Sequence, residues 1–369
     1  MSGTHLASKR NGKIELLRFV FASTVLCFHV RPDAWDHTVM LFPGVELFPA
    51  GKLGVEFFFL LSGFLMAKSI DSQYKRTPTH NLPPANLSED TFAYVSKKVK
   101  AILPYHVLFS IVALAIGIKG HPSKELQSFL IDNVLSLFLL NSTGMVKGTL
   151  GIIAPEWYLS SMFLMMLVLY PLAKRYWKTV PLTVCPFVGL LCIGYIVQTN
   201  GIFPGNIKAW GGITLYCNIR ALGELCLGIT SFALCEKLSA SSIESRVKAT
   251  VIKIIEVACY CLALYLMCVR ESNTHQLVLM LFFVGLTISM SRYGAGNQSP
   301  LLQNSFMRLL GEVSLPVYLC QNVVRAIVRL SPLELSGTQH FLTVVLLTYA
   351  VGFASVLVHR IAIRRAAQS

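Results

Sequence analysis

Ten long apolar segments are the feature that most limits what this chain can fold into. Each segment has 17 residues or more, and about 20 residues of α-helix cross the hydrocarbon core of a bilayer. Only 14% of the 369 residues are charged, whereas a soluble domain carries about 25%. Because backbone groups in lipid must hydrogen-bond internally, the sequence predicts an all-α, polytopic transmembrane helical bundle that forms a single domain over residues 1–369. The expected spans are residues 14–31, 51–68, 101–118, 155–173, 180–198, 213–235, 251–269, 275–291, 308–328 and 339–358.

The lysine and arginine residues orient these expected spans. With ten spans, 21 of the 32 basic residues fall on one side of the membrane and 8 on the other. Basic residues concentrate in cytoplasmic segments, so we expect both termini in the cytoplasm. The segment 69–100 is then a basic cytoplasmic loop, and its prolines and weak periodicity predict an irregular structure. This clustering between apolar blocks also accounts for the net charge of +14 without a nucleic-acid partner.

An eleventh apolar segment, 126–140, is shorter and contains Asp132, Asn133 and Ser136. Counting it as a span would invert every later segment and put the basic clusters outside the cell. The charge distribution therefore favours a position in the outer interface or a re-entrant path, within an extracytoplasmic segment 119–154.

Arg18 and His29 place two ionisable side chains within the first span, and such residues in a membrane helix are candidates for function. Eleven residues at 100° each return to within about 20° of the starting direction, so both project from one face of the helix, about 16 Å apart. Ala22 and Val25 lie between them and are small enough to leave a groove. The alternative is that Arg18 extends toward the cytoplasm and His29 marks the outer interface.

Other polar residues lie near the outer ends of the spans. Glu56 precedes Ser62 and Gly63 in the second span, and the alternative to a site there is a helix-packing motif with an interfacial acid. Arg220 and Glu224 are one turn apart, which is typical of a structural ion pair. The remaining candidates of this kind are Glu156, Trp157, Tyr158 and Gln321.

Taken in order along the chain, these residues resemble the acyltransferase-3 family of membrane acyltransferases. The most specific motif is a basic residue followed, after ten intervening residues, by histidine, here Arg18 and His29. The second is a Gly-Val-x-Phe-Phe run that ends in Ser62-Gly63-Phe64. Weaker matches are Lys97, Lys98, Lys100, Pro104, Tyr105, Trp157, Tyr158, Leu159, Arg220, Glu224, Gly228, Gly311, Ser314, Tyr318 and Leu319. The chain departs from the family pattern at Ala101, where arginine is usual, and at Gln321, where histidine is frequent.

The resemblance implies an integral membrane O-acyltransferase of the cell's inner (cytoplasmic) membrane. It implies transfer of an acyl group, usually acetyl, from cytoplasmic acyl-CoA to a hydroxyl of a surface or lipid-linked glycan, without a metal. A polyanionic donor suits basic cytoplasmic segments. The expected donor-binding residues are Lys97, Lys98, Lys100, Ser62 and Gly63, and the expected acceptor-binding residues are Glu56, Glu156, Trp157, Tyr158 and Gln321.

His29 is the expected general base and Arg18 the residue that orients the donor. A sugar hydroxyl is a poor nucleophile at neutral pH, and imidazole is the side chain suited to take its proton there. A covalent acyl-histidine relay is the mechanistic alternative. The competing class is a transporter or flippase without catalysis, because intramembrane Arg, His and Glu also line transport paths, although no pair of matching broken spans is evident.

The orientation can be tested by labelling with an impermeant thiol reagent in intact cells. In a Cys-free background, a cysteine that replaces Ser369 should resist the reagent because the C-terminus is expected inside. A cysteine that replaces Thr143 should react from outside. Labelling of the C-terminal probe in intact cells would contradict the ten-span orientation.

Overall fold

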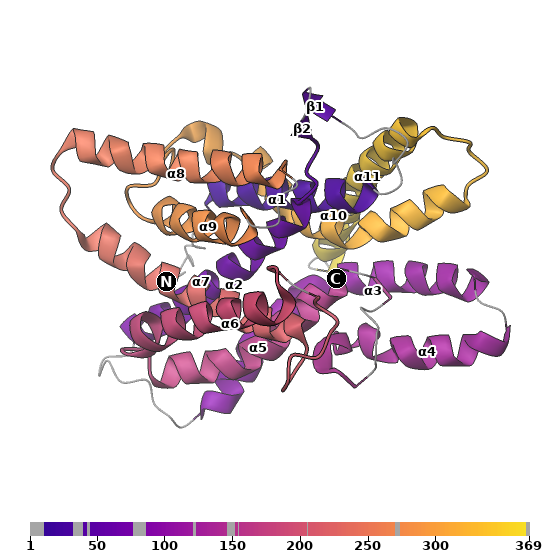
Figure 1. Cartoon of the computed structure of the whole chain (residues 1–369), viewed down its shortest axis with the longest axis horizontal. Helices are drawn as coiled ribbons and strands as arrows, with labels where there is room; N and C mark the ends of the chain where they lie inside the picture. The colour runs from indigo at the N-terminus through magenta and orange to yellow at the C-terminus, as the bar shows by residue number, and fades with distance from the viewer. Residues whose placement is uncertain are drawn as a thin grey trace.

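The structure is a computed structural model that describes residues 11–31, 40–42, 45–76, 86–120, 123–145, 152–153, 155–204, 206–269 and 274–366. Helices dominate this part of the chain, which confirms the all-α prediction (Figure 1). Its only paired strands are β1 (Met40–Phe42) and β2 (Val45–Glu46), which form an antiparallel hairpin. The α-helices are α1 (Gly12–Val30), α2 (Gly54–Arg76), α3 (Leu87–Gly120), α4 (Ser123–Leu137), α5 (Glu156–Arg175), α6 (Cys185–Asn200), α7 (Tyr216–Ala240), α8 (Arg246–Met267), α9 (His275–Met290), α10 (Ser305–Leu330) and α11 (Gly337–Ala366). Short helical turns lie at η2 (Gly51–Leu53), η4 (Asn141–Thr143), η5 (Val180–Val184) and η7 (Pro300–Leu302).

Among the described residues, 7 helical segments are long and apolar enough to cross a membrane, so the protein is a multi-pass membrane protein. They correspond to seven of the ten expected spans. The other three expected spans coincide with α1, α9 and α10. α9 has only 16 residues, whereas α1 and α10 carry ionisable side chains within their apolar runs.

The segment 69–100 differs from the expected irregular loop. Residues 69–76 continue α2 and residues 86–100 belong to α3, while 77–85 lie outside the described residues. α3 packs antiparallel to α5: Tyr94 stacks on Tyr170 with ring centroids 4.6 Å apart, and Ser110 bonds Glu156 near the other end. The part of α3 that packs on α5 therefore begins before residue 101, and Lys97, Lys98 and Lys100 are helical.

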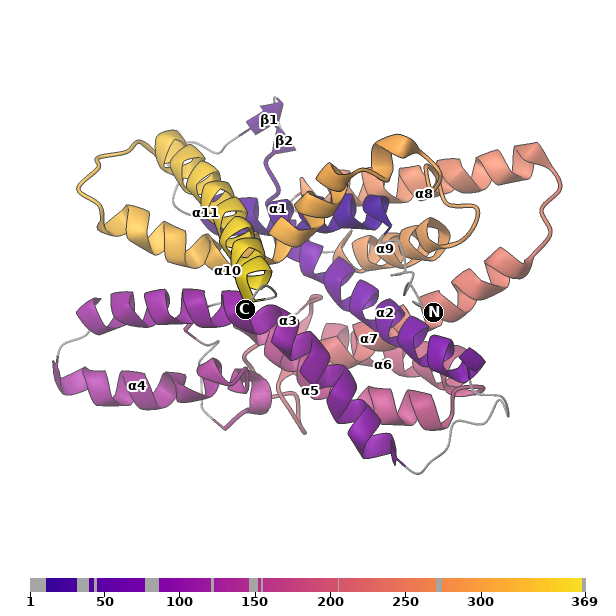
Figure 2. The ribbon, with the colours of Figure 1, turned by 180° about the vertical axis from the view of Figure 1, so that it is seen from behind.

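The segment 126–140 is helical for most of its length. α4, with 15 residues, is shorter than the roughly 20 residues that cross a bilayer. Figures 1 and 2 both show α4 running beside α3 as a helical hairpin at one edge of the molecule. This arrangement is compatible with the expected interfacial or re-entrant position, which stays a prediction.

α2 and α7 form the centre of the bundle, and Figure 2 shows α2 running diagonally through the middle of the molecule. In the most apolar 18-residue stretch of each helix, 72% of the stretch is buried in α2 and 83% in α7, against 22% in α3. The two helices cross at glycines. A Cβ added to Gly63 would lie 2.2 Å from the Leu225 carbonyl oxygen, and one added to Gly228 would lie 2.2 Å from the Leu60 carbonyl oxygen. Only glycine permits so close a backbone approach.

Replacing Gly228 by alanine should therefore destabilise the protein. The added methyl group would force the backbones of α2 and α7 apart, and overpacking of this kind costs about 1–3 kcal/mol or more. Thermal unfolding of the detergent-purified protein would measure the loss. The matched control is Gly194→Ala on α6, where a Cβ would meet nothing within 4 Å, and an equal effect of both substitutions would contradict this explanation.

Candidate functional site

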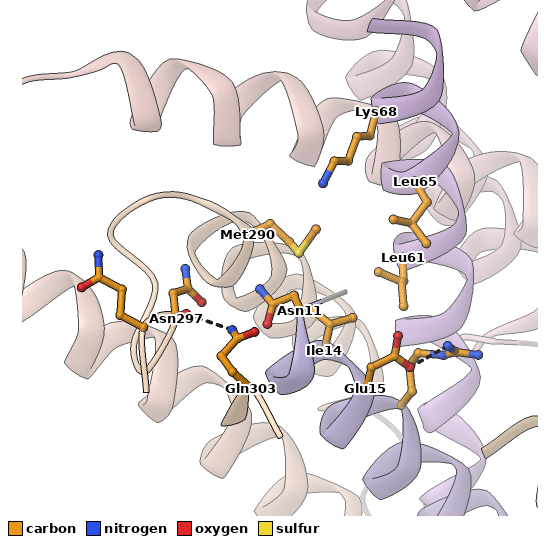
Figure 3. A pocket seen from close by; sticks show the side chains of 11 residues that line it. Asn11, Ile14, Glu15, Leu61, Leu65, Lys68, Met290, Asn297 and Gln303 are labelled. Carbon is orange, nitrogen blue, oxygen red and sulfur yellow. Dashed lines mark hydrogen bonds and ion pairs between the residues drawn. The ribbon is translucent and has the colours of Figure 1, made fainter. Parts of the chain in front are cut away.

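A cavity of about 800 Å³ lies among three helices and the connection between α9 and α10. The N-terminal part of α1, the middle of α2, the end of α9 and the loop from Ser291 to Asn304 surround it (Figure 3). The start of α1 and the end of α9 are both on the side that the charge distribution predicts to be cytoplasmic. Its lining residues are Asn11, Ile14, Glu15, Arg18, Leu61, Leu65, Lys68, Met290, Asn297, Gln298 and Gln303.

Cationic side chains gather at this cavity. Arg18 and Lys68 line it, and the ammonium group of Lys98 on α3 is close enough to Arg18 for the two charges to interact. The Lys98 ammonium also lies 5.3 Å from the centre of the Tyr94 ring, a cation–π contact that stabilises a partly desolvated cation. The cavity therefore presents a positive wall.

Two basic residues at the nearby helix ends form ion pairs. Lys75 bonds Glu236 at 2.8 Å, and Lys174 bonds Asp90 at 2.5 Å. Lys68 is seven residues, or about 10 Å, before Lys75 along α2. Lys68 is thus about two helical turns away from the ion pair that Lys75 makes near the end of α2.

Glu15 holds Arg18 in position. Its Oε2 atom accepts from Arg18 Nη1 at 2.9 Å, and the Glu15 side chain is only 8% exposed. A Cβ added to Gly311 would lie 1.7 Å from that same oxygen, so Glu15 fills a space that α10 leaves open only because residue 311 is glycine. The Gly311 position, noted in the sequence as part of a family pattern, thus supports Arg18 through Glu15.

His29 lies at the other end of α1, away from the cavity. Its Nδ1 atom is 2.9 Å from the Val25 carbonyl oxygen. A carbonyl only accepts hydrogen bonds, so Nδ1 carries the proton and Nε2 keeps an unprotonated lone pair. Two side chains of α10 lie near the ring: Gln321 is within hydrogen-bonding reach of it, and Arg325 is a nearby positive charge. The Oε1 atom of Gln321 is buried and makes no hydrogen bond of good geometry among the described residues.

The expected groove between Arg18 and His29 is not open. Ala22 and Val25 are both fully buried in the core. On the other helices, Tyr158 is within electrostatic range of Arg18, and the Tyr158 and Tyr318 rings pack at 5.8 Å. The amide of Gln321 bonds the Tyr318 carbonyl at 2.9 Å. These two tyrosines form a tyrosine cluster that is near Arg18 on one side and bonded to Gln321 on the other.

The expected donor-binding residues do not share one place. Lys98 is half-buried beside Arg18, whereas Lys97 and Lys100 are exposed on α3. Gly63 faces the backbone of α7, and Ser62 Oγ lies 3.4 Å from the Tyr158 hydroxyl. None of these five residues lines the cavity.

Glu56 belongs to a buried charge cluster with the expected Arg220–Glu224 pair. Arg220 donates to both carboxylates, through Nε to Glu224 at 2.9 Å and through Nε and Nη2 to Glu56. Both glutamates are fully buried, and the guanidinium lies 5.1 Å from the centre of the Trp157 ring. The cluster holds α2 against α7 and the start of α5. Glu56, Arg220 and Glu224 therefore have a structural role.

Glu156 is also fully buried, in a contact that the sequence did not indicate. Ser110 Oγ donates to its Oε1 atom at 3.2 Å, and His106 Nδ1 lies 3.6 Å from the same atom. His106 and Ser110 are fully buried as well. His106, expected near the cytoplasmic end of the third span, instead contacts the first residue of α5, because the part of α3 packed on α5 begins earlier than expected.

Sequence reasoning missed several residues of the cavity. Glu15 could have been found from its spacing of three residues to Arg18, which places both on one helix face. Lys68 was used in the sequence analysis only to orient the spans, not as a candidate binding residue. The amide side chains Asn297, Gln298 and Gln303 gave no signal, because they lie in a connection and reach the cavity only through the packing of α1 on α10.

The fold and these two sites define a multi-pass membrane protein with a cationic cavity at one end of a buried helix and a basic imidazole at the other. The match of residues 11–359 to the acyltransferase 3 family, described as an acyltransferase domain, shows that the chain belongs to this family. The resemblance drawn from the sequence is thereby confirmed, and family membership implies transferase activity with an acyl donor. Searches of curated proteins and of solved structures found no match.

Replacing Arg220 by methionine should strongly destabilise the protein. The substitution would leave two buried carboxylates without their cation, and breaking a buried pair costs about 3–5 kcal/mol. The matched control is Arg360→Met, because Arg360 pairs with Glu312 where both side chains are at least 33% exposed, and such pairs contribute about 0–1 kcal/mol. Chemical denaturation in detergent would compare the two, and an Arg220→Met protein as stable as the control would contradict the structural role.

Proposed function

We propose that this protein transfers an acyl group, acetyl in the simplest case, from cytoplasmic acyl-CoA to a hydroxyl of a surface or lipid-linked glycan at the cell's inner membrane. The observation that carries the proposal is the geometry of α1. One helix holds an arginine in a cationic cavity and, about 16 Å further along its axis, a histidine whose Nε2 lone pair is available.

The cavity is the proposed entry of the donor. Acyl-CoA carries several phosphate charges, and Lys68 at the cavity, together with Arg18 and the neighbouring Lys98, supplies positive charge for them. The volume of about 800 Å³ falls in the range of small-molecule sites. Leu61, Leu65 and Ile14 give it an apolar wall suited to the slender arm that carries the thioester.

His29 is the proposed general base. In the step, Nε2 takes the proton of the acceptor hydroxyl, and the oxygen attacks the thioester carbonyl carbon. The C–O bond forms, the C–S bond breaks, and the thiolate leaves with the proton that His29 gives back. Gln321 is the acceptor-binding candidate nearest to this chemistry, because its carboxamide lies beside the His29 ring.

The other acceptor-binding candidates have a structural role in this proposal. Glu56 and Glu156 are fully buried against Arg220 and Ser110, so neither carboxylate is available to a sugar. Trp157 covers the Arg220 guanidinium. Tyr158 is enclosed by its neighbours Phe59, Ser62 and Tyr318.

Changing His29 to alanine should reduce transfer by about 10²- to 10⁴-fold, the usual contribution of a positioned base. The assay supplies radiolabelled acetyl-CoA and glycan acceptors to the purified protein and measures labelled glycan. Binding of acetyl-CoA should be unchanged, because His29 does not line the cavity. His359→Ala is the control, since that histidine packs on Tyr105 of α3, away from α1.

Wild-type turnover in the His29 variant would remove this mechanism. A labelled acyl group trapped on His29 would favour the acyl-histidine relay over direct transfer. Glycan movement across the membrane without any covalent labelling would favour the transporter class instead.

A further inference from the structure

Positive side chains flank His29 at the end of α1 that lies away from the cavity. Lys52 of η2 places its ammonium group 5.9 Å from the centre of the Phe28 ring. The Phe28 ring in turn lies 5.3 Å from the His29 ring, in an edge-to-face arrangement. The ammonium group therefore lies no farther from the imidazole than these two distances combined, which is comparable to the length of a disaccharide.

Arg325 supplies a second cation beside His29, from a different helix. Its guanidinium is near enough to act on the imidazole as a positive charge. Arg329 follows one turn later on α10, and both arginines act in the same way on His340 in the first turn of α11. Positive charge thus approaches the imidazole from two separate elements, Lys52 from η2 and Arg325 from α10.

These side chains are open to the surroundings of the bundle. Phe28, His29, Lys52 and Arg325 are all half-buried, and Arg329 is exposed. A guanidinium is costly in contact with lipid tails, so the exposed Arg329 marks the direction of water. The charge distribution of the sequence predicts that this water is extracytoplasmic. A polar ligand is therefore expected to reach His29 from that side.

Lys52 has no anionic partner among the described residues. The two glutamates closest to it along the chain are both engaged by arginines, since Glu46 accepts from Arg31 at 2.6 Å and Glu56 accepts from Arg220 at 3.2 Å. A half-buried ammonium group has lost part of its hydration, and an anionic ligand with a charge-assisted hydrogen bond would compensate for that loss.

We propose that Lys52 and Arg325 form an anion subsite for the acceptor, a glycan that carries a carboxylate or phosphate group close to the sugar that is acylated. The proposal rests on the proposed acyltransferase function and names the class of the acceptor. The two cations bind the anionic group, and a hydroxyl of the adjoining sugar then lies at His29 Nε2. Charge complementarity of this kind selects an anionic partner over a neutral one of the same shape.

A structural role for Lys52 is the alternative. Glu56 and Glu224 share the single guanidinium of Arg220, and Lys52 is within electrostatic range of both Glu56 and Arg220. In that case Lys52 would only balance the charge of the buried cluster. The protein would then not distinguish an anionic glycan from a neutral one.

Isothermal titration of the full chain in nanodiscs of zwitterionic lipid tests this site with three forms of one tetraglucoside. The first form is unmodified, the second carries a carboxylate at C6 of its terminal sugar, and the third carries a phosphate at the same carbon. Wild-type protein should bind an anionic form about tenfold more tightly than the neutral form, the factor expected for a hydrogen bond to a charged group. The form that binds best separates an acidic sugar from a phosphorylated one. Equal affinities for all three forms would overturn the proposal, and this measurement needs no variant.

Variants locate the site. Lys52→Gln and Arg325→Gln should each reduce the preference for the anionic form, whereas Lys52→Arg, which retains the charge, should keep it. Arg308→Gln is the matched control, because it removes the same charge from the other end of α10 and so reveals any general attraction of anions to a chain with a net charge of +14. An equal loss of preference in the Arg308 variant would overturn the proposal.

Thermal unfolding of the same variants separates the subsite from the structural alternative. A Lys52→Gln protein that unfolds at a lower temperature but keeps the full preference would show that Lys52 only balances the buried cluster. That result would overturn the proposal, as would the full preference in the Arg325→Gln protein. A lost preference at an unchanged unfolding temperature would support the subsite.

The outcome is separable from that of the proposed function. A preference for the anionic glycan in a protein that transfers no acyl group would contradict only the proposed function. Acyl transfer to neutral and anionic glycans with equal KM values would contradict only the anion subsite.

Discussion

The close crossing of α2 and α7 is the contact on which the rest of the structure depends. Gly63 and Gly228 bring the two backbones together, and Arg220, itself buried, then reaches buried carboxylates on both helices. The close approach at the glycines and the buried ion pairs depend on each other. Without the close approach the guanidinium could not bond Glu56 and Glu224 together, and without the guanidinium two buried carboxylates would drive the helices apart.

α1 packs beside this centre and carries both ends of the proposed chemistry. A single helix keeps Arg18 and His29 at a constant separation, because an α-helix of this length is rigid compared with side chains and loops. Its inner end is fixed by Lys13 and Glu256 and by the contact of Glu15 with Gly311. The cavity end of α1 is therefore held firmly in place.

The candidate site was predictable only where chemistry is local in the sequence. Arg18 and His29 were found because a charge and an imidazole on one apolar helix are unusual wherever the helix packs. The Arg220–Glu224 pair followed from helical spacing, but its third member, Glu56, could not be assigned to it, because that contact spans 164 residues. Lys98 reaches Arg18 only because α3 starts at Leu87, and weak periodicity together with Pro104 hid that helix from sequence analysis.

The sequence by itself determined the class of this protein: hydropathy and charge require membrane-spanning helices, and ordered motifs identify the family, since both signals are read from residues close together in the chain. Only the tertiary structure decided which polar residues are available for chemistry. Glu56 and Glu156 look like candidates in sequence but are enclosed by partners from other helices. Asn297 looks like an ordinary loop residue but lines a cavity. Burial and pairing depend on distant segments that meet only when the helices pack, and no local pattern records them.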